Sequence, residues 1–196
     1  MTRRIIDFDT PERFASGSVG EPGDRTFFLQ ARQGSRVTTV MLEKEQVAVL
    51  ADRVLAVIDE VERRGLVAID AGPAGALDER PLEQPLDESF RVGTMIIAWD
   101  EDVDRLVVEA RSMTFDAGAG EAAMRPGDEV DDEDIPDDAP IGPDVLRVRL
   151  TPYMAQQFAR RANSVVAGGR PTCPYCGQVL ERTGHFCSRR FDDLIH

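Results

Sequence analysis

The sequence predicts an α+β protein in which two strand-strand-helix units contribute to an antiparallel sheet, followed by a small C-terminal knuckle. Two observations predict the units. Two segments of the chain have helical periodicity, and each of them follows segments rich in β-branched and aromatic residues. A third observation, a cluster of ligand-type side chains near the end, predicts the knuckle. We therefore expect a body at residues 1–167 and a separate tail at residues 168–196.

The first unit begins with a hairpin and ends in a helix. Residues 26–31 and 37–42 are rich in aromatic and β-branched side chains, and Gly34 between them favours a turn. Across residues 44–64 apolar side chains recur at spacings of three and four, and Gly65 supplies a stop. The stripe of this helix expected to be buried is Val47, Leu50, Ala51, Val54, Ile58 and Val61.

The second unit also begins with a hairpin. Residues 90–99 and 105–110 have the composition of strands and flank the acidic, turn-rich residues 100–104. Three alternate aspartates in this turn resemble the opening of a calcium-binding loop, but Arg105 and Arg111 stand where such a loop needs glycine and glutamate. A solvent-exposed hairpin turn is therefore expected.

A strand at residues 144–150 and a second helix complete this unit. Thr151 suits the N-cap, Pro152 suits the first helical position, and Gly168 with Gly169 ends the helix. The expected buried stripe is Met154, Ala155, Phe158, Ala162 and Val165.

The two strand-to-helix junctions correspond to each other. Residues 42–54 and residues 150–162 each begin with a leucine that closes a strand and precedes a helix. This correspondence suggests an internal duplication. The two units would form either two antiparallel sheets or one continuous sheet packed under two helices.

Two segments between these elements lack the pattern of a packed element. Residues 66–89 hold several Gly and Pro among acidic residues, so we expect a connector with at most a short strand at 66–69. Residues 117–143 are rich in Gly, Pro and acids, with eight acidic residues between positions 128 and 138. Charge repulsion and the shortage of apolar side chains predict a mobile acidic loop at 117–143.

The charge and composition of the chain limit the classes of partner and the cellular locations to be expected. The net charge of −13 disfavours a phosphate backbone as a general partner, although the residues from Thr151 onward carry a local charge of +3. No segment has the roughly 20 apolar residues of a membrane span, and the first residues reach acidic side chains instead of an apolar signal region. We expect a cytoplasmic protein with no membrane span.

A C-terminal cluster carries the clearest chemistry of the sequence. Cys173 and Cys176 form a Cys-x-x-Cys knuckle, and His185 and Cys187 follow as a second pair. Three thiolates and one imidazole are ligands that zinc takes in tetrahedral structural sites. A redox pair or an open catalytic zinc site is the alternative, but no strand leads into the motif and two further ligands follow it. We therefore predict one structural zinc ion.

The remaining sequence shows no catalytic signature. It lacks a phosphate-binding glycine loop, a nucleophile elbow and a Ser-His-Asp set. Asp7, Asp9 and Glu12 could act as acids, although surface charge is the more ordinary role for such carboxylates. Trp99, at the end of an expected strand, is expected in the core or at its rim.

Three functions remain open. The first is a zinc-stabilised binding or adaptor protein with a protein partner, because the predicted zinc site is structural and no catalytic set is present. The second is an enzyme or enzyme subunit with a cleft between the two units that uses Asp7, Asp9 or arginines. The third is nucleic-acid binding through the basic segment from Thr151 to the C-terminus, where Tyr175 and Phe186 lie near arginines, but the acidic body counts against it.

Three parts of the chain carry a family resemblance: residues 6–14, residues 93–95, and the Cys-Pro-Tyr-Cys-Gly and Gly-His-Phe-Cys motifs of the tail. With them the whole chain resembles an uncharacterised actinobacterial family classed only as a domain of unknown function. Members of that family tend to be encoded near a lipid-kinase-like protein and a histidine-phosphatase-like protein. The resemblance implies a cytoplasmic protein with a C-terminal metal cluster and supplies no activity.

Overall fold

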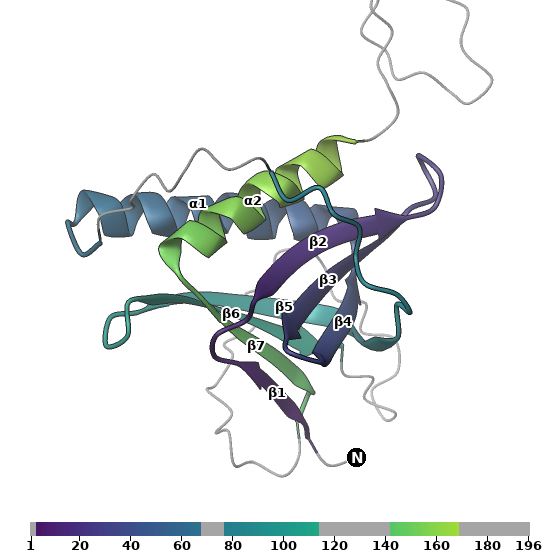
Figure 1. Cartoon of the computed structure of the whole chain (residues 1–196), viewed down its shortest axis with the longest axis horizontal. Coiled ribbons are helices and arrows are strands. Elements are labelled where there is room, and N and C mark those ends of the chain that lie inside the picture. The colour runs from purple at the N-terminus through teal and green to yellow at the C-terminus, as the bar shows by residue number, and fades with distance from the viewer. Residues whose placement is uncertain (1–2, 68–76, 114–141, 169–196) are drawn as a thin grey trace, which may run out of the picture.

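The computed structural model describes residues 3–67, 77–113 and 142–168 of the chain. These residues form one mixed sheet with two helices side by side on one of its faces (Figure 1). The α+β class expected from the sequence is therefore confirmed. In chain order the elements are β1 (Ile5–Phe8), β2 (Arg13–Val19), β3 (Thr26–Gln33), β4 (Arg36–Leu42), α1 (Lys44–Arg63), β5 (Glu88–Asp100), β6 (Arg105–Ser112), β7 (Val145–Leu150) and α2 (Pro152–Ala167).

The sheet is continuous and its strand order is β1-β7-β6-β5-β4-β3-β2. The expectation of a purely antiparallel sheet is wrong, because β4 pairs with β5 in parallel and β1 pairs with β7 in parallel. The first exception follows from the connection through α1, which returns the chain to the starting end of the sheet and so lays β5 parallel to β4. The second joins strands from distant parts of the chain.

The first expected unit has one strand more than the sequence predicted, whereas the second has the three strands that its sequence predicted. The described chain runs β2-β3-β4-α1 and then β5-β6-β7-α2, with antiparallel pairing within each set of three strands. The two expected hairpins, β3 with β4 and β5 with β6, are confirmed. Strands β1 and β2 were not expected.

The main core lies between the helices and the sheet. All six side chains of the predicted α1 stripe are buried. On α2, Ala155, Phe158 and Ala162 are buried as expected, whereas Met154 and Val165 are partly buried and pack against the core. Burial of a large apolar side chain contributes about 1.5–3 kcal/mol, so these stripes fix both helices on the sheet.

Both helices start as their sequences suggest. The Thr151 hydroxyl accepts a hydrogen bond from the Met154 N–H at 3.2 Å, which confirms the predicted N-cap of α2. At the start of α1 the Gln46 side chain accepts from the Glu43 N–H at 2.8 Å. Within the described residues, no helix combines the length and the apolar composition needed to cross a membrane.

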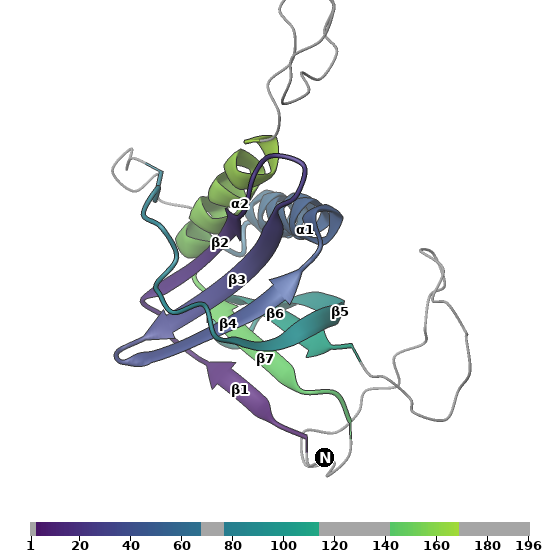
Figure 2. The same cartoon turned by 90° about the vertical axis from the view of Figure 1, so that its right-hand side faces the viewer.

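The opposite face of the sheet is covered over β2, β3 and β4 by residues 77–87, which we name the strap. Figure 2 shows the strap passing across β3 and β4 before the chain enters β5. Gln30 on β3 fixes its path, because its Nε2 donates to the Glu83 carbonyl at 3.0 Å and its Oε1 accepts from the Glu83 N–H at 2.8 Å. A second small core lies under the strap and consists of Ala15, Phe28, Met41, Leu82 and Leu86.

Two buried arginines tie the strap to β2 and α2. Arg13 donates to the Asp78 carboxylate at 2.7 Å and to the Arg80 carbonyl at 2.7 Å. Arg161 donates to the Ser16 carbonyl at 2.7 Å, to the Arg80 carbonyl at 2.8 Å and to the Asp78 carbonyl. Burial, and then the neighbouring Arg13 guanidinium, lower the pKa of Arg161. The strap is therefore held by hydrogen bonds from charged donors as well as by apolar contact.

Candidate functional site

The predicted metal ligands Cys173, Cys176, His185 and Cys187 lie outside the described residues, and so does most of the predicted acidic loop at 117–143. Within the described part of the chain, no three His, Cys, Asp or Glu side chains gather in a way that could hold a metal ion. The zinc site and the loop therefore stay predictions.

The structure brings Asp7 and Asp9 together with arginines of β7. Asp7 on β1 accepts a hydrogen bond from Arg149 Nη1 at 2.7 Å and lies 3.8 Å from Arg147 Nη1. Arg149 Nη1 also lies 3.6 Å from the exposed Asp9 carboxylate. Glu12 lies elsewhere and accepts from the Gly34 N–H at 3.1 Å, so the three candidate acids do not form one group.

The same ion pairs continue onto β6. Arg147 Nε donates to Glu109 Oε1 at 2.6 Å, and Arg111 Nη2 lies 3.3 Å from Glu109 Oε2. Arg111, Glu109 and Arg147 are each less than one fifth exposed. Each carboxylate of this network faces at least one guanidinium, and these ion pairs tie β6, β7 and β1 together. The arrangement suits the fixing of three strands better than proton transfer.

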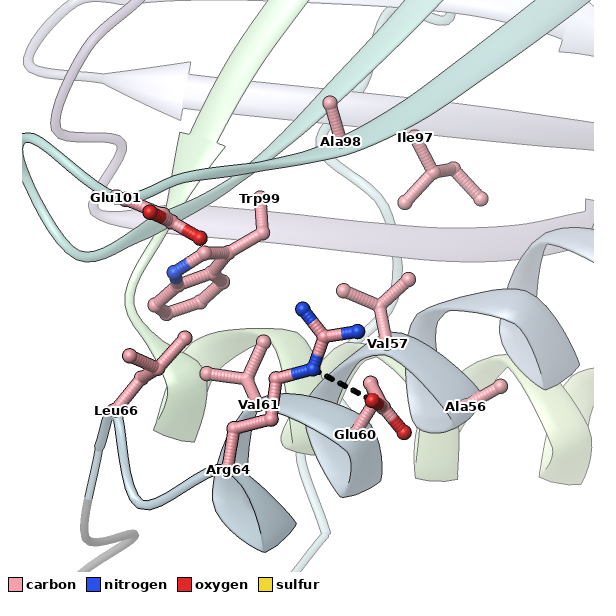
Figure 3. A pocket seen from close by; sticks show the side chains of 10 residues that line it. All are labelled: Ala56, Val57, Glu60, Val61, Arg64, Leu66, Ile97, Ala98, Trp99 and Glu101. Carbon is pink, nitrogen blue, oxygen red and sulfur yellow. Dashed lines mark hydrogen bonds and ion pairs between the residues drawn. The ribbon is translucent and has the colours of Figure 1, made fainter.

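A pocket of about 340 Å³ lies where the last turns of α1 approach the end of β5 (Figure 3). In Figure 3 the indole of Trp99 and the guanidinium of Arg64 lie on neighbouring sides of the same space, with Val57 and Val61 beside them. Trp99 is partly buried and packs against the main core, as its position at a strand end predicted. The pocket is lined by Ala56, Val57, Glu60, Val61, Arg64, Leu66, Ile97, Ala98, Trp99 and Glu101.

Two polar features of this pocket differ in how they are satisfied. Arg64 Nε donates to Glu60 Oε1 at 2.6 Å, and Arg63 also pairs with Glu60. The hydrogen bond from Arg64, followed by the charge of Arg63, lowers the pKa of Glu60. By contrast, the buried Nε1 of Trp99 has no hydrogen-bond partner among the described residues.

The pocket adjoins the β5-β6 turn, residues 100–104, which we name the acidic turn. It contains four carboxylates in five positions, and its one apolar residue, Val103, is 51% exposed. Arg105 does not neutralise these carboxylates by hydrogen bonding, because its Nη1 donates to the carbonyls of Val103 and Asp104 at 3.1 and 3.0 Å. The expected solvent-exposed turn is confirmed, whereas the pocket beside it was not predicted.

These features define an α+β protein with a mixed sheet, two helices on one face and an apolar pocket at the margin between them. The chain belongs to the family described as "Protein of unknown function (DUF3090)", whose model matches residues 6–187. No curated protein and no solved structure matches the chain. The resemblance to a family of unknown function is thus confirmed, while the actinobacterial origin and the Cys₃His cluster stay predictions.

Proposed function

We propose that the protein is a zinc-stabilised binding or adaptor protein whose partner is another protein. The pocket at the end of α1 carries this proposal. Its walls are mainly apolar, and Leu66, which lines it, is 44% exposed. Exposed apolar surface next to a concave site is a common mark of an interaction site.

The charged groups near the pocket favour binding over catalysis. Glu60 is engaged by two arginines, so its carboxylate is a poor base. Glu101 is exposed, where water would weaken any role in proton transfer. The carboxylates Asp7 and Glu109 of the sheet face are likewise paired with arginines. These pairings support a surface that recognises a partner.

Zinc would stabilise the folded structure of the tail. Cys173, Cys176, His185 and Cys187 would fill a tetrahedral shell, which leaves no open position for water or substrate. Three thiolates against the charge of the metal give a site of about −1, which nearby arginines of the tail would offset. The tail would then offer a second, shaped surface to the same partner.

The test begins with affinity capture on the full, zinc-loaded chain. A protein retained from a cell extract is then produced separately, and the two purified proteins are mixed. We expect a complex of fixed stoichiometry in analytical ultracentrifugation at physiological salt. Retained proteins that fail to rebind as purified components, together with turnover of a small molecule by the purified chain, would contradict the proposal and favour the enzyme alternative.

A further inference from the structure

We infer that the pocket docks a bulky apolar side chain of a partner segment that also carries Lys or Arg, and that the acidic turn binds this positive charge. The inference rests on the proposed function and names the chemistry of the partner. It joins two neighbouring features: the apolar pocket between α1 and β5, and the carboxylates of residues 100–104.

The pocket suits a side chain better than a free small molecule. Its volume of about 340 Å³ lies at the lower end of ligand pockets, which run from about 300 to 1,000 Å³. Small-molecule sites place a few polar groups so that they converge on the ligand. Here the two charged groups of the α1 wall, Glu60 and Arg64, bind each other instead. What remains for an occupant is apolar contact with Val57, Ile97 and Trp99, together with Glu101 of the acidic turn.

The charges around the pocket are unequal on its two sides. On the α1 side the single negative charge of Glu60 is offset by Arg63 and Arg64. On the β5 side the acidic turn carries four carboxylates, and the one guanidinium that follows them, that of Arg105, donates to backbone carbonyls. A partner segment would therefore gain most by placing a cation over the turn. Val103, exposed beside these carboxylates, offers further apolar contact.

The charge pattern favours another protein over the chain's own tail as the occupant. The tail begins after α2, and Figure 1 shows α2 ending at the opposite end of the helix layer from the last turn of α1. The tail residues 168–196 also carry nearly balanced charge, with four Arg and three acidic side chains. A segment with a stronger basic character is the better match to the acidic turn.

Selection of random 12-residue peptides displayed on phage against the full, zinc-loaded chain tests the inference. We expect the enriched peptides to share a large apolar residue with Lys or Arg within about one helical turn. Trp99 is the only tryptophan of the chain, so its fluorescence reports directly on the pocket. Binding of the synthetic peptides should change that emission and weaken as salt rises.

Two sets of variants test the apolar pocket and the acidic turn separately. Ala56→Phe fills the pocket from an exposed helical position and should lower peptide affinity at least about tenfold, whereas Val49→Phe, two turns earlier on α1, should not. Neutralising the turn should cost about tenfold and remove most of the salt dependence. The neutralised turn is Glu101→Gln, Asp102→Asn and Asp104→Asn, and its control on the exposed face of α1 is Glu45→Gln, Asp52→Asn and Asp59→Asn.

Three results would overturn the inference: enriched peptides without basic residues, binding that survives Ala56→Phe, or binding that ignores neutralisation of the turn. A selection that yields no peptide affecting Trp99 would overturn it too, and is the result expected if the tail fills the pocket. Circular dichroism of each variant checks folding, and the turn variants decide if Ala56→Phe does not fold. A purified partner that still binds the Ala56→Phe chain would sink this inference and leave the proposed function standing.

Discussion

The strap and the pocket are two places where the sheet meets another part of the chain, and they differ in how completely they are closed. Under the strap, Leu82 is 7% exposed and Gln30 exchanges two hydrogen bonds with the Glu83 backbone. At the pocket, Leu66 stays 44% exposed and the buried Nε1 of Trp99 has no partner among the described residues. The contact under the strap is therefore closed, whereas the contact at the pocket leaves apolar surface exposed.

This difference supports our proposal that the strap is structural and that the pocket is the surface available to a partner. A buried donor without an acceptor costs about 1–3 kcal/mol, and exposed apolar side chains keep surface that burial would stabilise. Under the strap, both polar groups of the Gln30 side chain are satisfied by the Glu83 backbone. The open contact at Trp99 is therefore the one that we propose to be functional.

The largest expected effect is at the arginine that ties the strap to α2. Arg161→Ala removes the buried guanidinium that donates to the carbonyls of Ser16 and Asp78, which should lower the free energy of unfolding by about 3–5 kcal/mol. Urea denaturation followed by circular dichroism measures this change. Arg80→Ala is the control, because its side chain is 71% exposed and pairs with the Asp78 carboxylate at the surface. Equal losses of stability in the two variants would show that the buried hydrogen bonds of Arg161 contribute no more than the exposed ion pair of Arg80.

A smaller effect should appear where the strap crosses β2. A Cβ on Gly17 would lie 2.7 Å from Leu82 Cγ, so Gly17→Ala must push the strap outward and should cost about 1–3 kcal/mol. Leu82→Ala alone should cost about 2–5 kcal/mol through the cavity it leaves. Because the second change removes the clash of the first, the double variant should lose clearly less than the sum. Strict additivity in urea denaturation would rule out this contact.

Asp78 in the strap should also make the stability of the fold depend on pH. The hydrogen bond from Arg80 is the main cause that holds the pKa of Asp78 well below its ordinary value of 3.8, with burial opposing it and Arg13 adding to it. A carboxyl whose pKa is depressed by folding stabilises the fold fully above about pH 4, and that contribution is lost as the pH falls further. Solvent screening keeps it to about 1 kcal/mol. Asp78→Asn should therefore flatten the fall in melting temperature between about pH 4 and pH 2.

The sequence predicted those elements whose pattern is local. The spacing from Val47 to Val61 defines α1, and Thr151 with Pro152 defines the start of α2. Strand β2 escaped prediction because it contains Gly17 and two serines, which disfavour a strand interior. It forms through pairing with β3 and cover from α2 and the strap, contacts that the local sequence does not encode.

The candidate site was predictable only in part for the same reason. The alternation of Arg147 and Arg149 in a half-buried strand predicts that both lie on one face, but not that Asp7 lies opposite them. Trp99 was expected at the core or its rim, but the pocket needs the approach of α1 residues such as Val57. The possible internal duplication, the zinc ligands and the acidic loop remain predictions.

The smallest expected effect on the body concerns zinc. We predict that elemental analysis finds about one zinc ion per chain and that Cys176→Ala removes it. The free energy of unfolding of the body, measured by urea denaturation and followed through Trp99, should change by less than about 0.5 kcal/mol, because the strap and pocket contacts lie within residues 3–168. A disulfide between Cys173 and Cys176 in reduced, zinc-replete protein would contradict the metal site.

The most direct test of the account compares two exposed positions of the α1 region in the presence of the partner. A photo-crosslinking residue, p-benzoylphenylalanine, replaces Leu66 at the pocket in one chain and Val49 on α1 in another; these side chains are 44% and 51% exposed. We predict crosslinks to the partner from position 66 and none from position 49, with an apolar residue and Lys or Arg in the crosslinked segment. Equal crosslinking from both positions, or crosslinking from position 49 alone, would contradict it.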